Sequence, residues 1–308
     1  MSLPRDPNEP EFDALHDAPD AWRPVIQEIA SHHAPGSSVT LPEDGSVLVG
    51  IADELVIKLY PPFMRGHFAF EKEALKHFAG KLSVATPKLV TSGDHSGWPY
   101  LVMTRLHGES LRLAWPRFEE TDRVVLLRAL GALVAEVHAL PVQPLRSLAP
   151  RWSDFIATQR SACAERQRRT GLPAHLHAEL EHFLDQRDSA NSEVNQSEVV
   201  LTGEYTPMNL FVKDGQLAAM FDFGDGMIGP REYDWLGPMC FLAAGSRERQ
   251  AAFIEGYSGE SPRDWTALRR RLLRLLLLHR YSNLRGQLAL QDWQSAPTLD
   301  ALTELIWP

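Results

Sequence analysis

Cysteine is scarce in this sequence, which has only Cys163 and Cys240 among its 308 residues. Two cysteines are too few for a disulfide scaffold, and they lack the paired spacing of metal ligands. Long hydrophobic runs are also missing. The longest candidate, residues 272–278, lies between Arg271 and Arg280, contains Arg274 and falls far short of the roughly 20 residues of a membrane span. The N-terminal residues lack the basic and then apolar pattern of a signal peptide. We therefore expect a cytoplasmic protein without a membrane partner.

An excess of basic residues is missing as well. The chain has 31 Lys and Arg against 40 Asp and Glu, a formal net charge of −9. This balance disfavours a nucleic-acid partner and slightly favours a cationic ligand. The hydrophobic fraction of 44% and the charged fraction of 23% are typical of a globular protein, and the length suffices for two lobes with their own cores. The oligomeric state stays open.

Short apolar segments separated by turn residues predict an antiparallel five-stranded sheet in the first third of the chain. The expected strands are residues 38–41, 46–51, 55–60, 88–91 and 100–104. Helical periodicity predicts one helix inserted over residues 65–79 and another before the sheet, over residues 21–33. Residues 1–17 are rich in proline and aspartate, and we expect them to be loose.

Helical periodicity dominates from residue 107 onward. The expected helices are residues 119–140, 152–169, 174–187, 246–257, 263–284 and 298–306. The predicted fold class is therefore α+β. A smaller N-terminal lobe, residues 1–106, would hold the sheet, and a larger, mostly helical lobe, residues 107–308, would follow.

Segment 198–224 concentrates the polar residues that are most informative about function. An apolar run, a polar loop with Glu204 and Asn209, a second apolar run, a turn at residues 213–215 and a third run ending at Asp222 predict strand, loop, strand, turn and strand. This order would bring three oxygen-bearing side chains to one end of a small sheet. Such a group suits phosphoryl transfer, in which a carboxylate faces the attacking hydroxyl while Asn and Asp hold magnesium.

Lys58 is a candidate ligand for nucleotide phosphates. A lysine in an apolar strand is just as often its solvent-facing residue, so Lys58 alone decides nothing. A lysine that grips phosphates needs a carboxylate to hold its long side chain, and Glu73 on the following helix can supply it. The helical pattern puts both Glu71 and Glu73 among the polar positions of residues 65–79.

In this order the residues resemble the aminoglycoside phosphotransferase family, the small-molecule branch of the protein-kinase-like fold that also includes choline, homoserine and methylthioribose kinases. The matching pieces include residues 56–59, 70–75, 85–89, 100–104, 133–140, 202–209, 220–224, 229–234 and 253–257. The resemblance implies a bilobal kinase-like fold and a magnesium-dependent enzyme that uses ATP.

The resemblance also implies a role for individual positions. Lys58 would bind the nucleotide phosphates with Glu73 as its ion-pair partner. Catalysis would depend on Glu204 and Asn209, and magnesium on Asn209 and Asp222. The hinge that contacts adenine would comprise Met103, Thr104 and Leu106, and Asp234 would be the N-cap of a helix that follows the metal loop.

The main departure from the family pattern is the segment Thr202-Gly203-Glu204, where the family has His-Gly-Asp. Glutamate has one more methylene than aspartate but a similar unperturbed pKa, about 4.3 against about 3.9, so the change affects geometry more than basicity. Kinases that act on hygromycin B resemble this chain in that glutamate and in an Arg-Glu-Tyr segment, here residues 231–233. The resemblance is therefore strongest to that subgroup.

The expected function is transfer of the ATP γ-phosphate to a hydroxyl of an aminoglycoside-like, cationic acceptor, which would confer antibiotic resistance. Asp154, Asp225 and Glu232 are candidate ligands of a cationic acceptor, whereas Arg280 and Arg285 keep a neutral or anionic acceptor open. Two other functions remain possible. One is a metabolic kinase for a choline-, homoserine- or sugar-like substrate, and the other is a nucleotide-binding pseudokinase.

Overall fold

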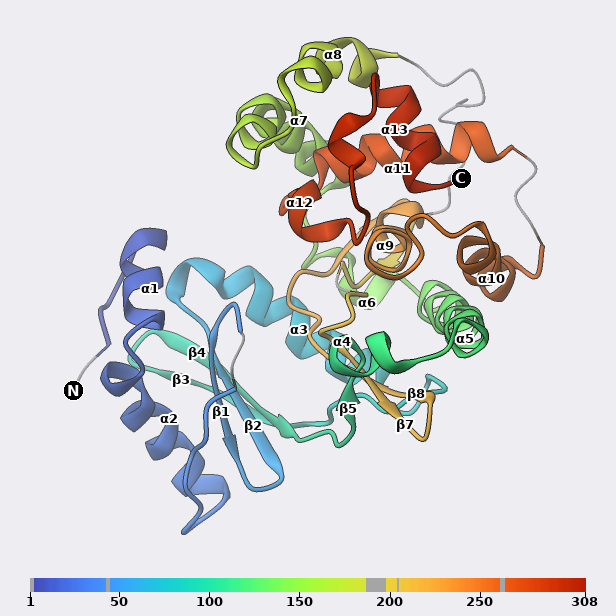
Figure 1. The fold of residues 1–308 in the computed structure, drawn as a ribbon. Coiled ribbons are helices and arrows are strands. Elements are labelled where there is room, and N and C mark those ends of the chain that lie inside the picture. The colour runs from blue at the N-terminus through green and yellow to red at the C-terminus, as the bar shows by residue number, and fades with distance from the viewer. Residues whose placement is uncertain (1–2, 43–44, 187–197, 204, 261–263) are drawn as a thin grey trace. The chain divides into compact units, whose positions relative to one another are not determined.

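The computed structural model describes residues 3–42, 45–186, 198–203, 205–260 and 264–308. The chain divides into two compact units (Figure 1). The first comprises Met1–His107 together with Ala219–Gly226, and the second comprises Gly108–Ala218 together with Met227–Pro308. The predicted α+β class is confirmed, because the first unit is built on an antiparallel sheet and the second is mostly helical.

The sheet of the first unit has four strands in the order β1-β2-β4-β3, where the sequence predicts five. They are β1 (Leu48–Ala52), β2 (Leu55–Leu59), β4 (Trp98–Thr104) and β3 (Leu89–His95), and every neighbouring pair is antiparallel. The predicted strand 38–41 forms a single bridge between Thr40 and Ile51. The next residue that could extend this pairing is Pro42, which has no N–H to donate.

Two helices cover one face of this sheet. They are α1 (Glu9–His16) and α2 (Pro19–His33), and their residues Phe12, Trp22 and Ile26 share a buried core with Ile57 and Leu59 of β2 (Figure 1). The prediction that residues 1–17 are loose is wrong for residues 9–16, which form α1. Asn8 and Glu11 form a capping box at its start, in which the Asn8 side chain accepts a bond from the Glu11 N–H at 2.9 Å and the Asn8 N–H donates to Glu11 Oε2 at 3.0 Å.

Helix α3 (Arg65–Phe78) follows the short 3-10 helix η1 (Pro62–Met64) and packs against β3 and β4. Alternate residues of a strand point to opposite faces of the sheet. Because Ile57 and Leu59 point toward α1 and α2, Lys58 between them points to the face where α3 lies. The strand pattern thus places one charged side chain against the α3 helix.

The second unit is mostly helical. Its longer helices are α5 (Glu120–His138), α7 (Trp152–Arg169), α8 (Ala174–Asp185), α10 (Arg247–Ser258) and α11 (Trp265–Leu278). Its shorter helical segments are α4 (Leu111–Ala114), η2 (Trp115–Arg117), α6 (Gln143–Arg146), α9 (Glu232–Gly237), η3 (Pro238–Leu242), α12 (Leu284–Gln287), η4 (Trp293–Ser295) and α13 (Leu299–Ile306). The predicted helix 263–284 is shorter than expected, because the chain leaves helical geometry at His279. No helix within the described ranges is long and apolar enough to cross a membrane.

Helices α5 and α10 pack closely through two glycines. A Cβ atom added at Gly131 of α5 would overlap the backbone carbonyl oxygen of Phe253, and one added at Gly256 of α10 would overlap that of Arg128. A side chain at either position would therefore push one helix backbone away from the other. Glycine is required here by close approach rather than by its backbone angles.

The short strands around the polar loop belong to two separate ladders. Strand β6 (Val199–Leu201) pairs with β9 (Met227–Gly229), whereas β7 (Leu210–Lys213) lies between β5 (Glu109–Ser110) and β8 (Gln216–Met220). The predicted strands are present, but the prediction that they form one small sheet is wrong. Asp214 and Gly215, both at positive φ, form a tight turn that joins β7 to β8. Strand β6 pairs instead with β9, in a separate ladder.

Candidate active site

Lys58 is the centre of a buried ionic cluster in the first unit. Its Nζ lies 2.8 Å from Glu71 Oε1, 3.1 Å from Glu71 Oε2 and 2.8 Å from Asp222 Oδ1. The lysine side chain is 9% exposed, the Glu71 side chain 1% and the Asp222 side chain 32%. One cation is thus shared by two carboxylates, and the carboxylate of Asp222 is the more exposed of the two.

The partner of Lys58 is Glu71, and the predicted partner Glu73 is wrong. Two residues correspond to about 200° around a helix, so side chains at these positions point in nearly opposite directions. Glu73 is on the exposed face of α3 and pairs with Lys76 at 2.6 Å. The sequence did contain the signal, because Glu71, Leu75 and Phe78 have the i, i+4, i+7 spacing of one helix face.

Tyr60 provides a second support for Glu71 that the sequence reasoning missed. Its hydroxyl donates a hydrogen bond to Glu71 Oε2, and its side chain is 1% exposed. Tyr60 lies just beyond β2, two residues after Lys58, so it points to the same face of the sheet. Burial, followed by the nearby charge of Glu71, raises the pKa of Tyr60 well above its usual value, which keeps the phenol a donor.

The charges of this cluster are strongly coupled. Burial by itself would lower the pKa of Lys58, but the carboxylates of Asp222 and Glu71 outweigh it and raise that pKa above its usual value. Burial raises the pKa of Glu71 as well, and the negative charge of Asp222 adds to this while Lys58 opposes it. Lys58 is therefore a permanent cation at neutral pH.

Asp222 follows β8 in a backbone conformation that is rare for residues other than glycine. Its φ is +68°, in the left-handed region, which aspartate tolerates better than most residues. The following segment is fastened to α3, since Phe223 is fully buried and contacts Phe78 edge to face at 5.0 Å. A Cβ atom at Gly226 would overlap the ring of Phe70. These contacts hold the carboxylate of Asp222 at Lys58.

In the second unit, Asp234 holds the start of the polar loop. Its Oδ2 accepts a hydrogen bond from the Thr202 N–H at 3.0 Å, and its Oδ1 accepts one from the Gly203 N–H at 2.8 Å. Asp234 is 1% exposed and lies inside α9, whose N-cap is Arg231 without a side-chain capping bond. The predicted helix-capping role of Asp234 is therefore wrong. Its carboxylate fixes the backbone of the loop instead.

His138 and Tyr257 extend this arrangement. His138 Nε2 lies 3.0 Å from Asp234 Oδ2, and its Nδ1 lies 3.0 Å from the Tyr257 hydroxyl. A carboxylate can only accept, so Nε2 donates to Asp234, and the Tyr257 hydroxyl is the hydrogen-bond partner of Nδ1. Residues from α5, α9 and α10 thus converge behind the loop. Such a buried, hydrogen-bonded group resists displacement of the loop backbone.

Two predicted catalytic positions belong to this loop. Glu204 lies outside the described residues. Asn209 is half-buried, its N–H bonds to the Thr206 carbonyl at 3.1 Å, and it immediately precedes β7. Asn209 belongs to the second unit, whereas Asp222, its predicted partner in magnesium binding, belongs to the first.

The predicted hinge residues lie at the end of β4. Met103 is buried and pairs with Val56 in the sheet. The Thr104 N–H donates to the Lys88 carbonyl at 2.9 Å, and the Thr104 hydroxyl accepts from the Lys88 N–H at 2.9 Å. Leu106 is half-buried and follows these paired positions. The backbone N–H of Thr104 is therefore already used within the protein.

The donor chemistry of Asp222 and Asn209 suits magnesium. Within the described ranges, no group of three or more His, Cys, Asp or Glu side chains could hold a metal ion on its own. Magnesium does not need such a cage, because it typically takes one or two carboxylates and completes its shell with water and substrate phosphates. Asp222 offers a partly exposed carboxylate and Asn209 offers an amide oxygen, both of them hard oxygen donors.

Solved structures of antibiotic kinases have the same fold. Aminoglycoside 2'-phosphotransferase-IIIa with GDP is 19% identical, with a TM-score of 0.68 over 92% of this chain and 97% of that one. The gentamicin complex of APH(2")-IIa is 16% identical, with a TM-score of 0.63 over 82% and 86%. A macrolide 2'-phosphotransferase from Brachybacterium faecium is 19% identical, with a TM-score of 0.59 over 83% and 90%. The protein therefore has a kinase-like α+β fold.

The sequence comparison identifies the family. The profile of the phosphotransferase enzyme family matches residues 43–271, which is well over half of the chain. The chain thus belongs to the phosphotransferase enzyme family.

Proposed function

We propose that this protein transfers the γ-phosphate of ATP to a hydroxyl of a small, aminoglycoside-like acceptor and depends on magnesium. The observation that carries the proposal is the buried cluster in which Glu71 and Asp222 hold Lys58. A lysine oriented by one carboxylate, next to a second and more exposed one, is the arrangement that phosphoryl transfer requires on the nucleotide side.

Lys58 would bind nucleotide phosphate oxygens while Glu71 keeps its side chain in place. Asp222 would hold magnesium together with Asn209, and the ion would supply positive charge to the phosphates. Because Lys58 bonds to Asp222 at 2.8 Å, nucleotide binding would redistribute this contact. Glu71, which keeps two bonds to Lys58 and one to Tyr60, would stay fixed during that exchange.

Glu204 would orient the acceptor hydroxyl and accept its proton late in the reaction. The residues just before it are held by Asp234 through two backbone N–H groups, which limits how far the loop can shift. The longer side chain of glutamate would then reach the hydroxyl from a fixed backbone. Asn209 would contribute to catalysis through its magnesium contact.

Leu106 is the best candidate among the hinge positions for backbone contacts with adenine. The N–H groups of Thr104 and Arg105 bond to the carbonyls of Lys88 and Glu54. Met103 would line the adenine pocket from its buried position at the end of β4. The preference for ATP over GTP would be decided at these backbone groups.

The acceptor that we favour is cationic, and hygromycin B is the first one to test because of Glu204 and residues 231–233. A second class of acceptor, a less charged metabolite, is supported by a specific observation. Asp154 pairs with Arg151 at 2.7 Å, Asp225 lies 3.7 Å from His67, and Glu232 pairs with Arg271 at 2.9 Å. The candidate acidic ligands thus already have basic partners in the chain.

The decisive experiment measures ADP formation with hygromycin B, kanamycin, a macrolide, choline and homoserine, each with and without excess EDTA. We expect acceptor-dependent turnover that EDTA abolishes. A Glu204→Gln variant is the matched control, because it should lose turnover while nucleotide affinity stays nearly unchanged. Tight ATP binding without turnover on any acceptor would instead indicate a pseudokinase. Turnover on choline or homoserine alone would indicate a metabolic kinase.

A further inference from the structure

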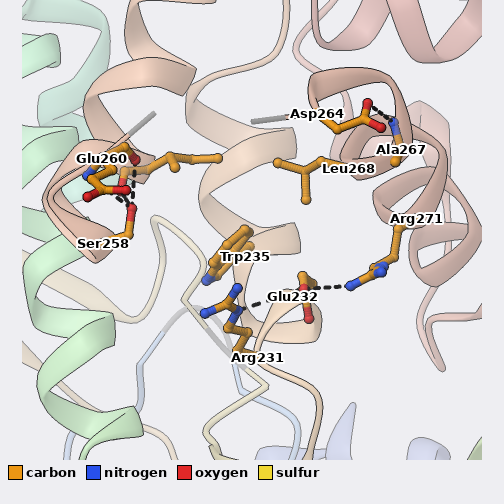
Figure 2. A pocket seen from close by; sticks show the side chains of 10 residues that line it. Arg231, Glu232, Trp235, Ser258, Glu260, Asp264, Ala267, Leu268 and Arg271 are labelled. Atoms are coloured by element: carbon orange, nitrogen blue, oxygen red, sulfur yellow. Dashed lines mark hydrogen bonds and ion pairs between the residues drawn. The ribbon is translucent and has the colours of Figure 1, made fainter. Parts of the chain in front are cut away.

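Two of the acidic candidate ligands have basic partners in different surroundings. Glu232 lines a cavity of about 280 Å³ between α9, α10 and α11 of the second unit, where Arg271 Nη1 donates to its Oε1 at 2.9 Å (Figure 2). Asp225 belongs to the first unit, and its Oδ1 lies 3.7 Å from His67 Nε2. The partner of Asp225 is therefore on α3, the helix that also supports Lys58.

The segment that contains Asp225 packs along α3. Phe223 contacts Phe78 edge to face with ring centroids 5.0 Å apart, and a Cβ atom at Gly226 would overlap the ring of Phe70. The Gly226 N–H donates to the Phe223 carbonyl at 3.2 Å, so the backbone forms a tight turn between these two residues. The contacts at both ends of the turn limit how far it can move along the helix.

Gly224 is the backbone position of this turn at which three charged or polar side chains meet. A Cβ atom added there would lie 3.3 Å from Glu71 Oε2, 3.8 Å from His67 Cβ and 3.9 Å from Asp222 Oδ1. His67 and Glu71 are four residues apart, so they lie on the same face of α3, one turn from each other. Any displacement of Asp225 away from His67 would therefore move the backbone directly beside Asp222.

The two carboxylates of the segment differ in their access to solvent. The side chain of Asp222 is 32% exposed and that of Asp225 is 16% exposed, whereas the His67 side chain is 33% exposed. The contact between His67 and Asp225 is a charge pair when the imidazole is protonated, and at 3.7 Å it is too long for a hydrogen bond. Partly exposed pairs of this kind add little to stability, so its main effect would be on the direction of the turn.

Nucleotide binding would change the contacts of Asp222 and leave those of Asp225 in place. Lys58 Nζ bonds to Asp222 Oδ1 at 2.8 Å, and in the proposed function the phosphates and magnesium redistribute this bond. The pair between His67 and Asp225 does not involve Lys58. It would therefore hold the turn on α3 while Asp222 exchanges lysine for magnesium.

We propose that His67 is a positioning residue of the nucleotide site, which acts through Asp225 to keep the carboxylate of Asp222 in place for magnesium. This inference rests on the proposed function, because it needs magnesium at Asp222. It assigns Asp225 to the magnesium side of the site, and not to the acceptor.

The test measures the Kd of a fluorescent ATP analogue for the full chain without an acceptor, once with excess magnesium and once with excess EDTA. A pH of about 6 keeps imidazole groups largely protonated. We expect His67→Ala to weaken binding about three- to fivefold with magnesium, and to leave binding in EDTA within about twofold because Lys58 and Glu71 are unchanged. Unchanged binding with magnesium, or equal weakening under both conditions, would overturn the proposal.

Two further variants and a control separate this role from a general loss of structure. Asp225→Asn should weaken magnesium-dependent binding as much as His67→Ala does, and the double variant should bind no more weakly than the singles, because all three lose the same contact. Lys76→Ala, which breaks the exposed pair with Glu73 on α3, is the control and should bind normally. In urea, His67→Ala and Lys76→Ala should lower the unfolding midpoint to a similarly small extent.

The outcomes distinguish this inference from the proposed function. If the affinity of the wild type for the nucleotide does not depend on magnesium, both are overturned. If the wild type shows that dependence and Asp225→Asn shares it unchanged, only the role of His67 and Asp225 is refuted. Should His67→Ala prove unfolded by circular dichroism, Asp225→Asn decides the question.

Discussion

The sharpest prediction concerns which glutamate of α3 supports Lys58, and it compares Glu71→Gln with Glu73→Gln. The Lys58–Glu71 pair is buried, with side chains 9% and 1% exposed, whereas the Glu73–Lys76 pair is open to solvent, with side chains 38% and 48% exposed. The same chemical change is thus made twice on one helix, two residues apart. Only the environment differs.

The magnitudes follow from burial. Removing one partner of a buried ion pair typically costs about 3–5 kcal/mol of the free energy of unfolding. Asp222 still neutralises Lys58 at 2.8 Å and the new amide can still accept a bond, so we expect the lower end, about 3 kcal/mol. The exposed pair is screened by water, and its loss should cost less than about 0.5 kcal/mol. Urea denaturation of both variants measures this difference directly.

Activity should separate the variants more strongly than stability does. A lysine that loses its support moves relative to the phosphates, and a displacement of about 1 Å can cost about 100-fold in rate. We expect Glu71→Gln to lower kcat/KM for ATP at least about 100-fold, measured below its unfolding midpoint, while Glu73→Gln stays within about twofold of the wild type. A loss of activity in Glu73→Gln together with normal Glu71→Gln would refute the assignment.

Four further predictions concern Tyr60, Asp222, Gly131 and the two cysteines. Tyr60→Phe removes a hydrogen bond that lowers the pKa of Glu71, so that pKa should rise and the acid limb of the pH profile of kcat/KM should move to higher pH; an unshifted limb would deny Tyr60 this role. Asp222→Asn should reduce magnesium-dependent turnover at least about 100-fold and leave the chain folded, as a magnesium titration of the rate and circular dichroism would show. Gly131→Ala should destabilise the protein in urea, because the cost of overpacking, about 3 kcal/mol, exceeds a gain in helix propensity of about 1 kcal/mol, while Gly66→Ala, whose Cβ would meet no atom within 4 Å, should be neutral or stabilising. Both cysteines are buried, and burial raises the pKa of their thiols, so neither should react with Ellman's reagent at pH 8 until the protein is denatured; reaction in the native state would contradict their burial.

Much of the fold was predictable because it depends on local periodicity. Short apolar runs bounded by turn residues define β2 and β4, and the 3.6-residue pattern defines α5 and α7, whose predicted bounds agree with the structure within two residues. The predictions of secondary structure that failed also have local causes. The strand predicted at residues 38–41 is reduced to one bridge because the next pairing position is Pro42, and α1 was missed although Asn8 and Glu11 form its capping box.

The types and order of polar residues also predict the kind of site that we propose. Lys58, Asp222 and Asn209 were predicted as a set from their residue types and their order along the chain, because phosphoryl transfer needs a cation and oxygen donors at strand ends. The structure joins Lys58 to Asp222, 164 residues apart, at 2.8 Å. Neither the distance nor the sharing of one lysine by two carboxylates could be derived from the order of residues.

Only the tertiary structure decided which acidic residues support the site. Glu71 and Glu73 are the same residue type two positions apart, and the neighbours that bury one of them come from β2 and from the segment after β8. Asp234 resembles a helix cap in sequence, yet its bonds reach the backbone of Thr202 and Gly203 in another element. Residue types and their spacing set the chemistry of this phosphotransferase. The partner of each charge depended on contacts between distant segments, which the sequence alone does not specify.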